Sequence, residues 1–307
     1  MTIIKNLRNI IGKLGLKQVL LPVYDMLYKR QALREMSKYD NKSTNYDLNT
    51  EKRTFELIVS LTTFPARIKS ASYVIDTLMR QTYKPDKIIL NLAHNEITPS
   101  ELPEEYENLQ TRGLSIEFVD NLKPHNKYLY TMKKSPNSVV VTVDDDILYS
   151  ENLLKDLVKS YEKHPNCVST MRAHRILFRD NKILPYNLWE YESTYSWEPQ
   201  FDLFATGVGG VLYPPNCMHE DVFSVDTIKS ISLENDDIWM KFMQLKKKTP
   251  VVLAGKDKPK LLYIPASQKM SLWSENRDNN RNNKIMKACK DFLKINDADF
   301  IRMLAGN

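Results

Sequence analysis

The stretch SVVVTVDDDILYSENLLKDL, from Ser138 to Leu157, joins a run of β-branched residues to three consecutive aspartates and a helical segment. The apolar run predicts a strand that is buried on both faces. Asp144, Asp145 and Asp146 follow directly, and they need compensation because a buried carboxylate without a partner is costly. A divalent cation and plain solvent are the two candidates.

Strands and helices alternate on both sides of this stretch. The predicted strands upstream are FELIVSLTTF, DKIILNLA and LSIEFVD, and the helices between them include IKSASYVIDTLMRQ and KYLYTMKKS. Downstream, CVSTMRAHRILF, FDLFATGVGGVLY and PVVLAG predict strands, and LENDDIWMKFMQLKK predicts a helix. This alternation indicates an α/β fold with a mainly parallel sheet. Ligands bind such sheets at the carboxyl ends of the strands, where the triple aspartate lies.

Composition sets bounds on function. The chain has 307 residues, a net charge of +6 and a pI of about 8.9. This mild excess, without an arginine-rich stripe, does not favour nucleic acid as a partner; phosphates of a small ligand or an anionic membrane account for it equally well. Three widely spaced cysteines form no disulfide framework and predict a reducing, cytoplasmic location.

The N-terminal segment, residues 1–36, has apolar residues at helical spacing with basic residues between them. Its uncharged runs are too short to span a bilayer. Two interpretations stay open: a basic amphipathic helix on the inner face of the cell membrane, or a helix packed on the catalytic body. We predict a linker over residues 37–54, a catalytic domain over 55–270 and a helical tail over 271–307.

The aspartate stretch predicts a metal site. In extended geometry Asp144 and Asp146 face one side of the strand and Asp145 the other. Two carboxylates at this spacing can hold Mg²⁺ or Mn²⁺, which would neutralise a diphosphate leaving group as a Lewis acid. The alternative is a solvated turn or a helix cap.

Two polar segments are predicted at the same sheet edge. LTTFPARI places Thr62 and Arg67 after the first strand, and arginine there can clamp phosphate. DNLKPHNKYLYTMKK offers Asn126 and Lys127 shortly before the aspartate strand. Each of these residues, considered alone, is best explained as an ordinary surface residue. Their predicted position at the same edge of the sheet is the observation that favours a phosphate-bearing ligand.

Two later segments add a loop and a second acidic pair. ATGVGGVLYPP holds a glycine turn that can bring its backbone close to a ligand, with a β-bulge as the alternative. SLENDDIWMKF opens a helix with Asp236 and Asp237, which can serve the helix dipole or act as a general base. Trp239, like the other tryptophans, is a candidate for sugar stacking, with core packing as the alternative.

The order LTTFPAR, VTVDDDI, TGVGGVLYPP, NDDIWMKF resembles GT-A nucleotide-sugar glycosyltransferases over about residues 55–265. It is similar to bacterial polysaccharide-cluster glycosyltransferases, and more distantly to the exostosin-like family 64. The resemblance implies a GT-A catalytic domain and Mn²⁺ or Mg²⁺ as cofactor. No QxxRW motif follows the late acids, which speaks against a processive synthase.

The resemblance also implies roles for the predicted residues. The metal ligands are Asp144 and Asp146, and the catalytic acids are Asp237 and Asp236. The donor nucleotide would meet Thr62, Arg67, Asn126, Lys127, Asp144, Asp145, Arg277 and Arg281, and the acceptor would meet Gly209 and Gly210. Trp239 is a further acceptor candidate as a sugar-stacking ring.

These features predict a metal-dependent glycosyltransferase that moves a sugar from a nucleotide diphosphate, UDP by preference, to a hydroxyl of a surface polysaccharide or lipid-linked glycan. Two alternatives stay open. One is a metal-dependent nucleotidyltransferase or phosphohydrolase that uses the same acids on phosphate alone. The other is a non-enzymatic glycan-binding module with a structural Ca²⁺. The sequence leaves inverting and retaining stereochemistry undecided.

Overall fold

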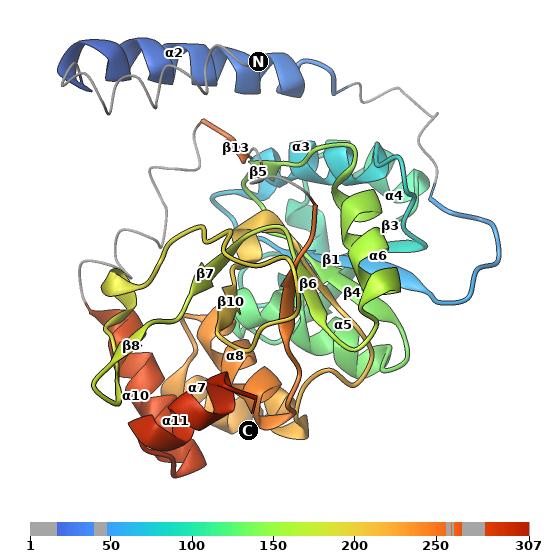
Figure 1. Cartoon of the computed structure of the whole chain (residues 1–307). Helices are drawn as coiled ribbons and strands as arrows, with labels where there is room; N and C mark the ends of the chain where they lie inside the picture. Colours follow the sequence, from blue (N-terminus) through green and yellow to red (C-terminus); the bar gives the residue numbers. More distant parts are fainter. Residues whose placement is uncertain (1–16, 40–47, 256–258, 260, 266–279, 307) are drawn as a thin grey trace.

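The computed structural model of the chain describes residues 17–39, 48–255, 259, 261–265 and 280–306 (Figure 1). Parts of the predicted N-terminal helix (1–36), linker (37–54), catalytic domain (55–270) and tail (271–307) fall on other residues, as do the sugar-stacking candidate Trp273 and the donor contact Arg277. These parts lie outside the described residues.

A seven-stranded sheet forms the centre of the molecule. Its strands, in spatial order, are β12 (Val251–Leu253), β6 (Val168–Thr170), β11 (Val211–Tyr213), β4 (Val139–Thr142), β1 (Leu57–Thr62), β2 (Lys87–Ala93) and β3 (Leu114–Val119). Neighbouring strands run parallel except β11, which is antiparallel to both β4 and β6. The predicted α/β class, with a mainly parallel sheet flanked by helices, is confirmed.

The order of the strands creates a crevice beside β1. The chain passes outward from β1 to β2 and β3, and then returns to β4 on the other side of β1. Loops that leave β1 and β4 therefore turn in opposite directions, and such a switch point is where open α/β sheets bind ligands. The register pairs Ser60 with Thr142, so the loops after β1 and β4 start side by side.

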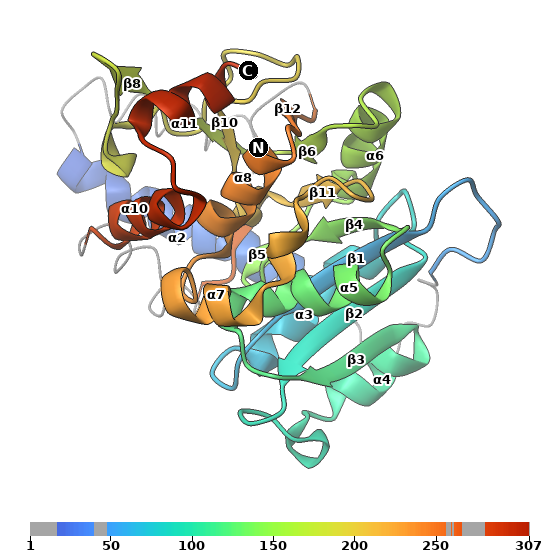
Figure 2. The same cartoon turned by 90° about the horizontal axis from the view of Figure 1, so that it is seen from below.

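Helices cover both faces of the sheet because the strands are apolar on both sides. One hydrophobic cluster joins β1 and β4 to α3 (Ile68–Met79), α4 (Glu105–Thr111) and α6 (Leu153–Lys163). A second cluster joins β11 and β12 to α5 (Leu129–Lys134), α7 (Val225–Ile231), α8 (Asp236–Lys246), α10 (Arg281–Leu293) and α11 (Asp297–Leu304). Figure 2 shows α5 in front of the central strands of the sheet.

Short elements complete the described part. Two-stranded pairs are formed by β5 (Ile147–Leu148) with β13 (Leu262–Tyr263), β7 (Ala173–Arg175) with β10 (Leu203–Ala205), and β8 (Phe178–Arg179) with β9 (Lys182–Ile183). Single 3₁₀ turns lie at Pro99–Glu101, Lys123–Lys127, Tyr186–Leu188, Gly207–Gly209 and Glu220–Phe223.

Two segments that the sequence predicts as single strands are each divided in two, and that prediction is wrong. CVSTMRAHRILF gives β6 and β7, because the backbone of Arg172 closes a turn on the hydroxyl of Thr170. FDLFATGVGGVLY gives β10 and β11, separated by the glycine turn. Gly210 has a φ of 85°, a conformation that residues with a Cβ rarely adopt. The chain thus leaves the central sheet at Arg172 and re-enters it at β11.

Helix α2 (Lys17–Met36) lies against β13, outside the sheet layers (Figure 1). The Tyr28 hydroxyl accepts a hydrogen bond from Tyr263 N at 2.6 Å and donates one to Leu261 O at 3.0 Å. Apolar side chains occur on both faces of α2. The rest of the segment predicted as an amphipathic helix, residues 1–16, lies outside the described residues. Within the described residues, every helix is too short or too polar to cross a membrane.

Candidate active site

A large cleft opens at the carboxyl ends of β1 and β4. Its volume is about 3270 Å³, several times the roughly 300–1,000 Å³ of a site for one small ligand. The loops after β1 and β4, the glycine turn, the start of α8 and the inner side of α2 all contribute to its wall. The cleft is therefore large enough for a nucleotide and a second substrate together.

Asp145 is compensated by the loop that follows β1. Its carboxylate accepts hydrogen bonds from Thr63 Oγ1 at 2.6 Å and from the Arg67 guanidinium at 2.7 Å. The same guanidinium lies 3.2 Å from Asp146. All four side chains are largely buried, so the pairing is shielded from water. Part of the compensation that the three aspartates need thus comes from a buried arginine.

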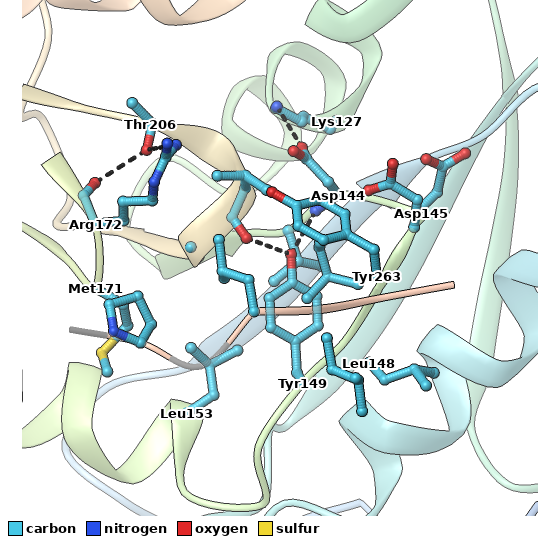
Figure 3. Close-up of a pocket in the computed structure, with 18 of the residues that line it drawn as sticks. Lys127, Asp144, Asp145, Leu148, Tyr149, Leu153, Met171, Arg172, Thr206 and Tyr263 are labelled. Atoms are coloured by element: carbon cyan, nitrogen blue, oxygen red, sulfur yellow. Dashed lines mark hydrogen bonds and ion pairs between the residues drawn. The ribbon is translucent and has the colours of Figure 1, made fainter. Parts of the chain in front are cut away.

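Asp144 is compensated by Lys127, which comes from the 3₁₀ turn before α5. The Lys127 ammonium lies 2.9 Å from Asp144 Oδ1 (Figure 3). It also lies 2.9 Å from Asp236 Oδ2. Burial alone would lower the pKa of Lys127, but the charges of Asp144 and Asp236 raise it well above its ordinary value. Lys127 therefore stays protonated and joins the acids after β4 to the acids that begin α8.

Asp237 is held by the glycine turn. Gly207 N donates to both carboxylate oxygens of Asp237, at 3.2 Å each. A Cβ on Gly207 would lie 2.7 Å from Lys127 Nζ, which explains why the smallest residue stands there. Burial, and next the charge of Asp236, raise the pKa of Asp237 above its ordinary range. Such a carboxylate can accept a proton near neutral pH.

The start of α8 is fixed by its own cap. The side chain of Asn235 accepts a hydrogen bond from Ile238 N at 2.9 Å, which satisfies one free amide of the first turn. Asp236 and Asp237 are then the first two helical residues and are turned into the cleft wall. A favourable interaction with the helix dipole alone does not explain why Asp236 contacts Lys127 and why Asp237 contacts Gly207.

The remaining predicted donor residues are placed differently. Thr62 lines the cleft, but its hydroxyl donates to Asn91 O at 2.7 Å. The Asn126 amide oxygen accepts from Leu122 N at 3.0 Å inside its own turn. Asn126 is also fully buried, so it shapes the turn that carries Lys127. Arg281 begins α10 and does not belong to the described lining of the cleft, whereas its neighbour Asn282 does.

Of the three predicted acceptor residues, only Gly209 lines the cleft. Gly210 packs on Leu153 and serves the turn through its positive φ. Trp239 has no exposed surface, and its indole donates to Val222 O at 3.2 Å. It fills the core beneath α8, and the site that we propose below does not include it.

Several cleft residues were missed by the sequence analysis. The Tyr149 hydroxyl accepts from Asp144 N at 2.9 Å and donates to Val208 O at 3.4 Å, which ties the triple aspartate to the glycine turn. Arg172 donates to Thr206 Oγ1 at 3.1 Å (Figure 3) and pairs with Glu192 at 3.2 Å. No local pattern marks these residues, because their partners come from distant segments.

Asp144 and Asp146 fit a divalent cation by the chemistry of their donor atoms. Burial and then the charge of Asp144 raise the pKa of Asp146 to about 7, so the two carboxylates are close enough to repel each other. A cation beside them would relieve that repulsion, with water and ligand oxygens as its other donors. Among the described residues, no group of three or more His, Cys, Asp or Glu is arranged to hold a metal without such help.

No protein-family model matches the sequence, and no curated protein matches it either. The solved structures that resemble it include S. aureus TarS 1–349, with 13% identity, 83% of this chain and 70% of that chain covered, and a TM-score of 0.48. Mannosyltransferase PcManGT from Pyrobaculum calidifontis, in complex with GDP-Man and Mn²⁺, shows 15% identity, 92% and 80% coverage and a TM-score of 0.40. A structure of 4-diphosphocytidyl-2C-methyl-D-erythritol synthase shows 9% identity, with 72% of this chain and 97% of that chain covered and a TM-score of 0.40. These scores are too low to argue a reaction from.

Proposed function

We propose that this chain is a metal-dependent glycosyltransferase that moves a sugar from a nucleotide diphosphate donor, UDP by preference, to a hydroxyl of a surface polysaccharide or lipid-linked glycan. One observation carries the proposal. Lys127 joins Asp144, at the end of β4, to Asp236, at the start of α8. The ammonium group of Lys127 thus lies between Asp144, which would face the diphosphate of the donor, and Asp236, which would face the sugar.

The donor end of the cleft lies around Arg67. Asp144 and Asp146 would hold Mn²⁺ or Mg²⁺, which when bound offsets the negative charge of the departing nucleoside diphosphate. Arg67 lies beside them and is fixed by Asp145, so its position is set before any ligand arrives. Thr62 and Arg67 on the first loop then form the wall that meets the nucleotide.

Asp237 stands at the reacting centre. If the reaction inverts the sugar, Asp237 takes the proton of the acceptor hydroxyl, and its raised pKa suits that task. If the reaction retains the configuration of the anomeric carbon, the same carboxylate stabilises the positive charge that develops on the donor sugar. In either case the two hydrogen bonds from Gly207 N hold the carboxylate in place.

The acceptor end is formed by the segment between β6 and β11. Tyr186, Tyr191 and Arg172 from this segment line the cleft together with Gly209. Burial, and next the charge of Asp237, raise the pKa of Tyr186, so its phenol lies within electrostatic reach of that carboxylate. Aromatic rings with polar edges suit the faces and hydroxyls of a sugar.

The proposal is tested with a panel of sugar nucleotides, with and without a glycan acceptor, in Mn²⁺ or chelator. We expect free nucleoside diphosphate to form only with the metal and to increase when acceptor is added. Release of pyrophosphate from a nucleoside triphosphate and a sugar phosphate, with no transfer to glycan, would assign the nucleotidyltransferase reaction instead.

The substitution Asp237→Asn tests the reacting centre. We expect turnover to fall by about 10²–10⁴-fold, the usual contribution of a positioned acid or base, while metal-dependent donor binding persists. Asp226→Asn, at an exposed position on α7, is the matched control and should keep full turnover. Equal turnover in all three proteins would contradict the role given to Asp237.

A further inference from the structure

We propose that the outward face of α2 binds an anionic lipid bilayer. This face consists of Val23, Met26, Arg30, Leu33 and Arg34. The inference goes beyond the reaction and does not depend on it, because it concerns a surface that lies outside the cleft.

The inward face of α2 is already used by the protein. Tyr28 bonds to the backbone on both sides of Leu262, and Ala32 is fully buried in the cluster that includes β1 and β4. Tyr28 and Met36 pack against the same cluster. Because this face is fixed, the opposite face of the helix is turned away from the body.

The outward face combines large apolar side chains with arginines. Val23, Met26 and Leu33 are 40%, 60% and 57% exposed, and they are three of the nine exposed large hydrophobic side chains in the described part of the chain. Arg30 and Arg34 lie between and beside them and are also exposed. The spacing i, i+3, i+7, i+10, i+11 places all five on one stripe of a helix.

Charge is divided between the two faces of α2. Its two acids, Asp25 and Glu35, line the cleft together with Lys29, whereas Arg30 and Arg34 do not. Residues 1–36 hold seven basic and two acidic residues, which amounts to +5 of the net +6 of the chain. A surface with apolar side chains among cations, next to a strongly basic segment, complements an anionic lipid surface better than it complements another copy of this basic face.

The outward face of α2 belongs to a helix that also lines the cleft. Tyr28 and Glu35 line the cleft from the opposite side of the same helix, so α2 is part of the cleft wall and the face that would contact lipid lies on the outside of that wall. Tyr28 also bonds to β13, and the residue after β13, Ile264, donates from its backbone N to Asp146 O at 2.9 Å. If the proposed glycosyltransferase function is right, an acceptor on a lipid carrier would meet the site at the bilayer surface.

The test is co-sedimentation of the full chain with vesicles, without donor or metal. We expect binding to phosphatidylglycerol–phosphatidylcholine vesicles and little binding to pure phosphatidylcholine. Arg30→Gln with Arg34→Gln should weaken binding about 30-fold, from about 1 kcal/mol for each basic residue at such a surface. Met26→Glu with Leu33→Glu should weaken it at least tenfold.

The matched control carries the same kind of change elsewhere. Phe178 and Leu188 are 50% and 56% exposed on the body, so Phe178→Glu with Leu188→Glu should leave vesicle binding unchanged. Equal binding by the wild type and both α2 variants would overturn the proposal, as would equal binding to neutral and anionic vesicles. A dimer in solution that Met26→Glu with Leu33→Glu dissociates, without vesicle binding, would assign the face to a second copy and also overturn it.

Discussion

At the scale of single residues, the site depends on the space beside Lys127. The ammonium is buried between two carboxylates, and removing one partner of a buried ion pair costs about 3–5 kcal/mol. Gly207 provides room for this arrangement, since a Cβ there would lie 2.7 Å from Lys127 Nζ. Its φ is not in the left-handed region, so alanine is allowed by the backbone.

Gly207→Ala is therefore expected to fold but to lose activity. The methyl group would displace the end of the Lys127 side chain and change how Asp144 and Asp236 are held. We expect turnover to fall at least tenfold, while the free energy of unfolding changes by no more than about 1 kcal/mol, because alanine also restricts the unfolded chain. Steady-state kinetics and chemical unfolding measure the two effects.

A double-substitution cycle separates this effect from a general disturbance. In a Lys127→Met background, Gly207→Ala should cause little further loss, because the group that it displaces is gone. Independent, additive losses would show that the methyl group acts through something other than Lys127.

At the scale of elements, helix α8 carries both the acids of the site and a buried lysine. The Lys241 ammonium donates to Phe201 O at 2.8 Å and Leu203 O at 2.7 Å, which fixes α8 to the start of β10. Burial lowers the pKa of Lys241 to about 7. The unfolded chain therefore binds a proton here at pH values where the folded chain does not.

Lys241→Met is expected to change how stability depends on pH. In the wild type, the contribution of Lys241 to the free energy of unfolding increases between pH 7 and pH 10.5, by up to about 1.4 kcal/mol for each pH unit. This contribution is lost as the pH falls through 7. The difference in unfolding free energy between the wild type and Lys241→Met should therefore shift in favour of the wild type between pH 7.5 and 9.5. The exposed Lys247→Met should show no such shift; parallel curves for all three proteins would refute the assignment.

At the scale of the whole molecule, the sheet could be predicted from sequence better than the site could. Apolar runs such as SVVVTV identify strands directly, and their carboxyl ends fix where Asp144 and its neighbours lie. Asp236 and Asp237 were also predicted as site residues, and both line the cleft. The ion pair between Lys127 and Asp236 was not predicted, because it joins residues that lie more than a hundred positions apart in the sequence.

The same reason explains the other differences. Arg172 and Tyr149 acquire partners only when the glycine turn folds back on β4, and no local pattern encodes that contact. Asn126 was assigned to the nucleotide because of its neighbours, but its amide oxygen accepts a hydrogen bond inside its own turn. Trp239 follows the acids in sequence, yet helical geometry directs it into the core.

The whole arrangement can be tested by calorimetric titration of the protein with UDP-sugars, with Mn²⁺, with Mg²⁺ and with chelator. The account predicts binding that tightens at least tenfold with one of the metals, and predicts that this gain disappears in Asp144→Asn and Asp146→Asn. Sugar-nucleotide binding that neither metal strengthens, or that both variants retain in full, would contradict it.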